Sequence, residues 1–357
     1  MSAVVAAFEH FLVFGAVLAL PAFALAGAVR FAARHRAGWS SPHGRARVYA
    51  AAVIAPPIVA AWLVAATLTP EWWLDAPAFA AAHASVDHER HLLALVFAAW
   101  EPTPAVVACL FLLTVVTLIS VSVVRGALRV RHAFAQLAGT DTAPAAADVR
   151  RLKAWAHRRD LAVGVLLTDY PVSFVWGLRR AKLVVSSGLL RTLSRPALRA
   201  VVEHEAAHHA RRDNLLRLIL SVASYGTLLA PFTRRILRWW SEEVELTCDA
   251  VAAATTRDPL TLASALVQVR RGMSVAPRAL GVGFVPDEAC VLERRVEHLL
   301  ALADGLPSGA AVTAMRRGPR SSVLALALGF IVTLTGAVVL SPLAIHRAAE
   351  ALLLFGR

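Results

Sequence analysis

Cysteine is scarce in this chain of 357 residues, which contains three, Cys109, Cys248 and Cys290. One lies in a long apolar run and two lie in a region expected to face a reducing compartment, so a disulfide framework is excluded. Aromatic residues do not alternate with the arginines as a surface for stacking nucleic-acid bases requires. The net charge of +13 therefore does not predict direct nucleic-acid binding. Membrane topology and contact with anionic lipids explain the arginines better.

Charged residues are also few, at 17%, and they are missing from long stretches of the chain. Four apolar runs have about the 20 residues that a helix needs to cross a bilayer. They comprise residues 11–29, 48–68, 105–124 and 322–340. The mean hydropathy of +0.60 agrees with an integral membrane protein. The first run is too long for a signal peptide, and Glu9 stands where basic residues belong, so we expect a retained anchor.

The distribution of arginine predicts the orientation of these runs, because cytoplasmic loops carry an excess of basic residues. Arginines crowd the loop 30–47 and both ends of the segment 125–320, whereas the loop after the second run is mainly acidic. We therefore expect the segment 125–320 in the cytoplasm and both termini outside. Residues 1–124 then form a region with three membrane helices, and residues 321–357 form the last membrane helix and a short external tail.

The most informative motif is HEAAH, from His204 to His208. In a helix the two histidines stand one turn apart on the same face, so both imidazoles can bind one zinc ion. Glu205 then lies beside the metal, where it can take a proton from a zinc-bound water. Two nitrogen ligands, a base and an open coordination position are what a zinc hydrolase requires.

The context of the motif favours this function over a solvated helix that carries HExxH by chance. Ser194 is a suitable helix N-cap, and Pro196 lies in the first turn, where its missing N–H costs nothing. Leu198, Val201 and Val202 then recur at helical spacing. The motif is therefore predicted to lie inside an amphipathic helix.

A third metal ligand is expected downstream, in the segment 241–250. Glu245 and Asp249 stand one helical turn apart, and the economical assignment makes Glu245 the ligand and Asp249 the partner of a zinc-bound histidine. Glu242 and Glu243 are rival ligands, although neither has an acidic residue four positions later. The alternative is a solvated acidic helix end.

These motifs resemble those of the integral-membrane zinc peptidases of the BlaR/MecR type, which carry HExxHxxxxD followed by ExxCD. The matching stretches are HEAAHHARRD, ending at Asp213, and ELTCD, ending at Asp249. The stretch SFVWGLRRAKLVVSSGLLRTLS, residues 173–194, is similar to theirs and to that of the related HtpX-type peptidases. The resemblance covers about residues 150–256.

The resemblance implies a role for each matched position. It implies that His204, His208 and Glu245 bind zinc. It also implies that Glu205 and Asp249 are catalytic residues and that Asp213 is an orienting partner. Cys248 before Asp249 favours the BlaR/MecR branch over HtpX, although on spacing alone a small buried helix residue is the better interpretation of this cysteine. Two departures stand out. Because the sequence ends at Arg357, we expect no C-terminal penicillin-binding sensor domain like that of the best-known members, and Ala206 replaces the commoner leucine.

Short strands are expected before the motif helix. Residues 148–159 predict a helix, and residues 162–167 and 182–186 predict strands. Related zinc peptidases hold an extended substrate against an edge strand at this place. Either 173–176 or 182–185 could provide that edge, and an ordinary core hairpin is an equal alternative.

The apolar segment 215–233 needs a special arrangement, because a full membrane crossing would put Glu245 on the opposite side from His208. A hairpin or a helix in the inner leaflet keeps both residues on one side. We favour the inner-leaflet helix. The zinc then lies near the cytoplasmic membrane surface.

We therefore predict an α-helical membrane protein with four transmembrane helices and an α+β cytoplasmic metallopeptidase domain of the zincin kind. The expected activity is that of a Zn2+-dependent metalloendopeptidase in the plasma membrane of a bacterium. By the resemblance, its substrate is the protease itself or a cytosolic helix-turn-helix repressor. The alternatives are HtpX-like quality control of membrane proteins and a non-catalytic, zinc-binding signal transducer. The expected partners are the lipid bilayer and a protein or peptide substrate, and a homodimer is a further assembly to be tested.

Overall fold

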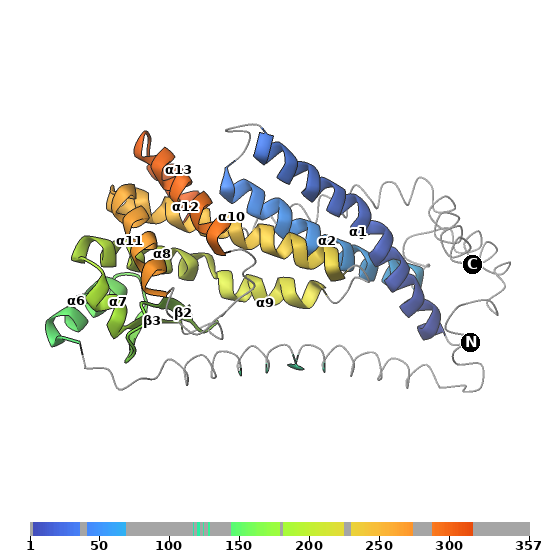
Figure 1. The fold of residues 1–357 in the computed structure, drawn as a ribbon. Helices are drawn as coiled ribbons and strands as arrows, with labels where there is room; N and C mark the ends of the chain where they lie inside the picture. Colours follow the sequence, from blue (N-terminus) through green and yellow to red (C-terminus); the bar gives the residue numbers. More distant parts are fainter. Residues whose placement is uncertain are drawn as a thin grey trace.

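The structure, a computed structural model, has a bundle of long helices at one end and a small α/β unit at the other (Figure 1). It describes residues 3–35, 41–68, 144–178, 181–224, 230–273 and 288–316, with isolated helical positions between 117 and 128. The helices are α1 (Ala3–His35), α2 (Pro42–Leu68), α6 (Ala146–His157), α7 (Ser187–Thr192), α8 (Arg195–Arg211), α9 (Asp213–Ala223), α10 (Ala230–Thr256), α11 (Pro259–Met273), α12 (Glu288–Ala303) and α13 (Gly309–Arg316). The strands are β1 (Ala162–Leu166), β2 (Ser173–Trp176) and β3 (Lys182–Ser186).

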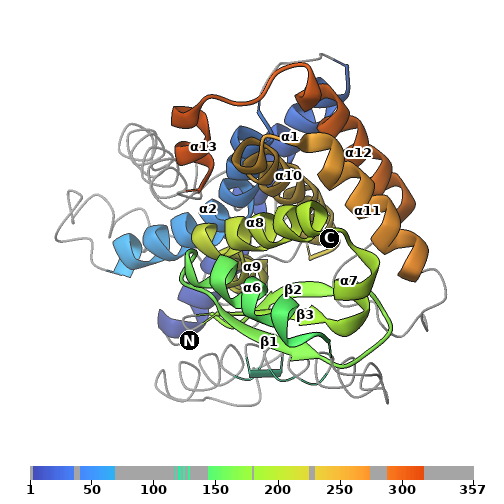
Figure 2. The ribbon, with the colours of Figure 1, turned by 90° about the vertical axis from the view of Figure 1, so that its left-hand side faces the viewer.

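The bundle consists of α1, α2, α9 and α10 (Figures 1 and 2). The helices α1 and α2 are antiparallel and pack along their length, and α10 lies against α2. Their common core contains Val29, Tyr49, Val53 and Trp240, all buried. Because α10 continues from this bundle into contact with α8, α11 and α12, one rigid helix joins the two ends of the molecule.

The structure tests the predicted membrane helices only in part. Among the described residues, one stretch is long and apolar enough to cross a membrane, Phe14–His35 of α1. The second run, 48–68, is helical as part of α2. The runs 105–124 and 322–340 lie outside the described residues, apart from isolated helical positions in the first of them. A topology with four membrane helices therefore stays a prediction.

The described parts of the segment 215–233 belong to two helices that run in opposite directions, α9 and the start of α10. The helix α9 leads away from the α/β unit and α10 returns to it (Figure 1). Near the start of α10, Phe232 stacks on Phe23 of α1, with ring centroids 6.4 Å apart. The direction of α10 brings Glu245 back to the side of His208, as both arrangements considered from the sequence require. Where these helices lie relative to a bilayer stays a prediction.

The sheet has the strand order β1-β3-β2, so β2 is an edge strand. The strand β3 pairs in parallel with β1 and antiparallel with β2, with Phe174 opposite Val184. The predicted strands around residues 162–167 and 182–186 are thus confirmed, as is the helix before them, now α6. Of the two candidate edges, 173–176 is the edge, and the other is the central strand.

The helix α8 begins and ends as its sequence dictates. Ser194 is the N-cap and accepts a hydrogen bond from the backbone N–H of Ala197, and a proline occupies the first turn, as predicted. The helix stops at Arg212, whose φ of 55° is left-handed. Because α9 starts at the next residue, Asp213 is turned back toward the last turn of α8.

A buried cluster of charged side chains, here called the arginine cluster, joins four helices. It contains Arg30 of α1, Arg45 of α2, Arg294 of α12, and Glu242 and Glu243 of α10. Arg30 Nη2 lies 2.6 Å and Arg294 Nη1 2.9 Å from Glu242 Oε2, and Arg45 Nη2 lies 2.8 Å from Glu243 Oε2. Glu243 is 0% exposed, so its charge depends on these partners. The cluster therefore engages both rival ligand candidates in structural ion pairs.

Gly188 of α7 supports the loop that leads into β2. A methyl group on its Cα would overlap the backbone carbonyl of Asp169. We expect Gly188→Ala to lower the free energy of unfolding by about 1–3 kcal/mol, the usual cost of overpacking. Gly305→Ala is the control, since nothing lies within 4 Å of that position. Thermal unfolding in detergent measures both, and equal midpoints for the two variants would contradict this packing.

Candidate metal centre

Two imidazoles meet on one face of α8. The Nε2 atoms of His204 and His208 lie 3.2 Å apart. The ring centroids are 4.9 Å apart, and the ring planes meet at 77°. Helical spacing alone brings the two rings to the same side, one turn apart. The mutual tilt lets both nitrogens point at one position in front of the helix.

Glu245 of α10 supplies a third donor to that position. Its Oε2 lies 3.4 Å from His204 Nε2, and its Oε1 lies 3.5 Å from His208 Nε2. A tetrahedral zinc ion bound at about 2.0–2.1 Å holds its ligand atoms about 3.3 Å apart. The observed separations are close to that length, with each histidine nearest a different oxygen of Glu245. The structure brings together the three residues that the sequence nominated as ligands.

The other nitrogen of each ring faces a carboxylate. His208 Nδ1 lies 2.9 Å from Asp213 Oδ2, and His204 Nδ1 lies 2.9 Å from Asp249 Oδ1. A proton on each Nδ1 leaves the Nε2 lone pair free to bind a metal. The two Nε2 atoms and the carboxylate oxygens of Glu245 are then all acceptors. At these short separations they repel one another unless a metal ion or a proton lies between them. The donor set thus has the chemistry of a cation site.

Two arginines hold these carboxylates in their charged form. Arg211 Nε donates to Asp213, with distances of 3.2 and 3.1 Å to the two oxygens. Arg295 donates to both oxygens of Asp249, at 2.8 and 2.7 Å, and its Nη1 lies 3.0 Å from Glu245 Oε2. Burial opposes ionisation, but the arginines outweigh it and lower the pKa values of Asp213, Asp249 and Glu245.

Neither arginine was predicted from the sequence to have a role at the site. Arg211 lies inside the HEAAHHARRD stretch, so its place two residues before Asp213 was a usable signal. Arg295 follows Asp249 by 46 residues and belongs to no motif. Only the packing of α12 against α10 brings it to the site.

Glu205 lies beside the three donors, on the same turn of α8. It is 7% exposed, and Ser173 Oγ donates a hydrogen bond to its Oε1 at 2.9 Å. Because Ser173 belongs to the edge strand β2, the strand that flanks the site also orients the base. A carboxylate held at one oxygen keeps the other for a proton in transfer.

A cavity of about 380 Å3 opens in front of these groups. Part of its lining is the end of the preceding loop and the start of β2, from Pro171 to Val175. An apolar part of the lining comes from α11; it comprises Leu262, Ala265, Leu266 and Val269. The cavity is large enough for an extended peptide to reach the donors.

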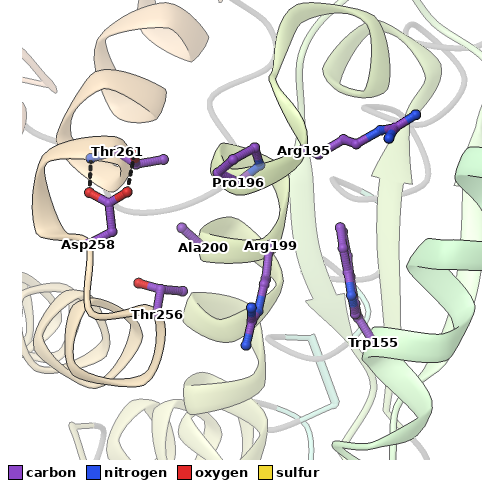
Figure 3. Close-up of a pocket in the computed structure, with 8 residues that line it drawn as sticks. All are labelled: Trp155, Arg195, Pro196, Arg199, Ala200, Thr256, Asp258 and Thr261. Carbon is purple, nitrogen blue, oxygen red and sulfur yellow. Dashed lines mark hydrogen bonds between the residues drawn. The ribbon is translucent and has the colours of Figure 1, made fainter.

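A second cavity, of about 250 Å3, lies near the first turns of α8 and α11 (Figure 3). It is lined by Trp155, Arg195, Pro196, Arg199, Ala200, Thr256, Asp258 and Thr261. Asp258 accepts hydrogen bonds from the backbone N–H and the hydroxyl of Thr261, so it serves as a helix cap. Because the lining has no histidine and its carboxylate is occupied, the metal chemistry belongs to the first cavity.

Cys248 is close to the site, and its thiol is fully buried. Its Sγ lies 3.5 Å from His208 Nδ1 and 3.8 Å from Asp213 Oδ2, so these three residues form a second set of conceivable ligands. Burial, reinforced by the charge of Asp213, raises the pKa of the thiol well above its usual range. A neutral thiol is a poor metal ligand. The interpretation of Cys248 as a small buried residue agrees with this environment.

Comparison with known proteins agrees with this chemistry. Residues 146–276 are similar to the family model described as Peptidase family M48. A protein named "Protease HtpX homolog" from Gemmatimonas aurantiaca is 28% identical over 174 residues, covering 38% of this chain and 62% of that protein. A second of that name, from Pseudarthrobacter chlorophenolicus, is 28% identical over 159 residues, covering 36% of this chain and 55% of its own length.

The chain thus spans less than two thirds of the length of these relatives. No solved structure matches it. The resemblance noted from the motifs is supported at the level of the M48 domain and of HtpX-like relatives. The BlaR/MecR branch stays a prediction.

Purified protein should bind about one zinc ion per chain. His204→Ala or His208→Ala should abolish binding, and Glu245→Ala should weaken it strongly, because each removes one corner of the tetrahedron. Glu242→Ala is the matched control, since its carboxylate pairs with arginines instead. Metal content after gel filtration measures the effect. Zinc retained by Glu245→Ala but lost by Glu242→Ala would refute this ligand set.

Zinc binding should also release a proton from His204. Burial by itself lowers its pKa, but hydrogen bonds with Asp249 and Glu245 outweigh burial and raise the pKa to about 10. The metal-free ring is then protonated at neutral pH, so zinc displaces about one proton and its affinity rises about tenfold per pH unit up to that pKa. Calorimetry in buffers of different ionisation enthalpy counts the protons. Asp249→Asn should release clearly fewer at neutral pH, and an unchanged count would speak against this cause.

Proposed function

We propose that this chain is a membrane-bound zinc metalloendopeptidase whose site lies close to the cytoplasmic membrane surface. The observation that carries the proposal is the convergence of His204, His208 and Glu245 in one cavity with the base Glu205. A binding site alone does not need a buried carboxylate beside its ligands. The M48 domain match supports the same chemistry.

Each residue of the site has a defined task in peptide hydrolysis. His204, His208 and Glu245 would hold the zinc ion, which supplies a Lewis acid for the scissile carbonyl and for water when bound. Glu205 accepts the proton of the attacking water and later delivers it to the leaving amine. Ser173 keeps that carboxylate oriented through its 2.9 Å hydrogen bond.

The edge strand β2 supports a binding mode for the substrate. The strand β3 covers one side of β2, so an extended peptide can add to the other side through main-chain hydrogen bonds. Asn214 Nδ2 donates to Val175 O at 2.9 Å and to Gly177 O at 3.3 Å. This side chain limits the open edge to the residues next to the metal centre.

The arginine cluster supports a membrane location for the site. It binds α1, which contains the apolar stretch Phe14–His35, to the part of α10 just before Glu245. Arginines crowd the end of α1, the start of α2 and the loop between them, which favours the cytoplasmic side for this end of both helices. A multi-pass plasma-membrane protein with an internal catalytic domain accounts for these features.

Two biological roles share this chemistry. The ELTCD stretch favours signalling proteolysis, in which the substrate is the protease itself or a cytosolic helix-turn-helix repressor. The relatives named HtpX homologs favour quality control of membrane proteins. Incubating the purified protein with candidate repressors and with unfolded membrane proteins, with and without a chelator, separates the two. A non-catalytic signal transducer would cleave neither.

Glu205→Gln tests the proposed reaction. The amide cannot accept a proton, so we expect peptide cleavage to fall by about 10²–10⁴-fold while zinc content and thermal stability stay unchanged. The matched control is Glu203→Gln, two residues earlier on α8, whose carboxylate pairs with Arg159. Cleavage retained by Glu205→Gln would leave the mechanism without its base.

Cysteine labelling in whole cells tests the proposed topology. In a background without reactive native cysteines, Arg150→Cys, Arg212→Cys and Ala310→Cys should resist a membrane-impermeant maleimide, because the arginine-rich side is internal. Ala80→Cys should react. Labelling of Arg212→Cys from outside would place the motif helix on the wrong side for the cytoplasmic model.

A further inference from the structure

We infer that Arg295 is a positioning residue of the metal centre, supplied by α12 from outside the matched peptidase domain. Its guanidinium joins the ligand Glu245 to Asp249, the partner of His204. The inference deepens the proposed function and rests on its metal site. It assigns a role to a residue that neither the motifs nor the family match, which ends at residue 276, includes.

All three nitrogens of the Arg295 guanidinium are engaged at the site. Nε and Nη2 donate to the two oxygens of Asp249 at 2.8 and 2.7 Å, and Nη1 lies 3.0 Å from Glu245 Oε2. The planar fork of arginine suits this bidentate contact, whereas a lysine ammonium is a single point of charge. The side chain is 16% exposed and lines the cavity.

This contact controls two of the three ligands. Glu245 is held directly, because Nη1 of Arg295 lies 3.0 Å from its Oε2. His204 is held through Asp249, whose Oδ1 lies 2.9 Å from His204 Nδ1. The remaining ligand has its own supports within the family domain, Arg211 and Asp213. Two arginine–aspartate pairs therefore support the metal centre, and the Arg295–Asp249 pair depends on α12.

The helix α12 is anchored independently of the metal. The preceding residue, Arg294, belongs to the arginine cluster and pairs with Glu242 and Glu243. One turn further on, Leu299 is 0% exposed and packs in a core with Ala200 of α8 and Leu262 of α11. These contacts place Arg295 before any metal binds. They also supply a control, because Arg294 makes comparable ion pairs from the same helix with Glu242 and Glu243, which lie outside the assigned ligand set.

The test uses full-length protein in detergent and measures Zn2+ affinity by competition with a chromophoric chelator. We expect Arg295→Met to weaken zinc binding about 10–100-fold, the usual effect of removing a partner of a metal ligand. Arg295→Lys should fall between Arg295→Met and the wild type. Arg294→Met should lower thermal stability about as much as Arg295→Met does. It should leave zinc affinity within about threefold of the wild-type value, because additivity holds for independent sites.

Cobalt provides a spectroscopic readout of ligand geometry. Co2+ bound to the wild type should show the intense visible bands of a tetrahedral site, and Arg295→Met should show weaker bands, because a released Glu245 carboxylate binds through both oxygens. Guanidinium ion at about 10 mM should partly restore zinc affinity to Arg295→Ala by entering the space that the side chain leaves in the cavity wall. This rescue and the lysine variant keep the test decisive if Arg295→Met does not fold.

Wild-type zinc affinity in Arg295→Met would overturn the inference, as would an equal loss in Arg294→Met, which would mark a general effect on the fold. The result is independent of substrate. If Arg295→Met loses zinc and the wild type cleaves no peptide, the positioning role stands and the protease proposal fails. If the wild type cleaves peptides and Arg295→Met binds zinc normally, the protease proposal stands and the positioning role fails.

Discussion

Donor atoms of three residues from two helices converge at the centre of this molecule: the two histidine Nε2 atoms are 3.2 Å apart, and each lies 3.4–3.5 Å from an oxygen of Glu245. Groups of this kind repel, so the protein must impose their convergence. The surrounding residues do so by alternating charge outward from the site. Behind each histidine stands a carboxylate, and behind each carboxylate stands an arginine. Burial strengthens these interactions and makes each of them necessary, since an unpaired charge in the interior is costly.

The helix α10 connects the metal centre to the predicted membrane region. Its first turns pack on α1 and α2, its middle holds Glu242 and Glu243 among the arginines, and the next turn presents Glu245. A rigid helix rises 1.5 Å per residue, so the metal ligand lies within about 5 Å, along the helix axis, of the arginine cluster. Movements of the two N-terminal helices and of the metal ligand are therefore mechanically linked. The apolar residues of α11 and the edge strand line the same cavity.

Local spacing made most of the candidate site predictable. The i, i+4 pairs His204–His208 and Glu245–Asp249 follow from helix geometry, and the N-cap at Ser194 follows from local chemistry. Long-range packing made the rest unpredictable. The periodicity of the sequence does not tell which of two short strands lies at the edge of the sheet. It also does not tell that Arg295 contacts Asp249, 46 residues earlier in the chain. The ion pairs of the rival ligands Glu242 and Glu243 come from α1, α2 and α12, each distant in sequence. The apolar runs indicated membrane helices, but hydropathy does not predict which residues contact one another in the folded chain.

The position of Arg295 in the chain also affects biosynthesis. Translation delivers the HEAAH helix first, then Glu245 and Asp249, and only later the helix that holds the last two in place. A ribosome-bound fragment that has the entire motif therefore still lacks a supported metal centre. The order of synthesis thus withholds a complete site until α12 has been made and Arg295 has reached Asp249 and Glu245.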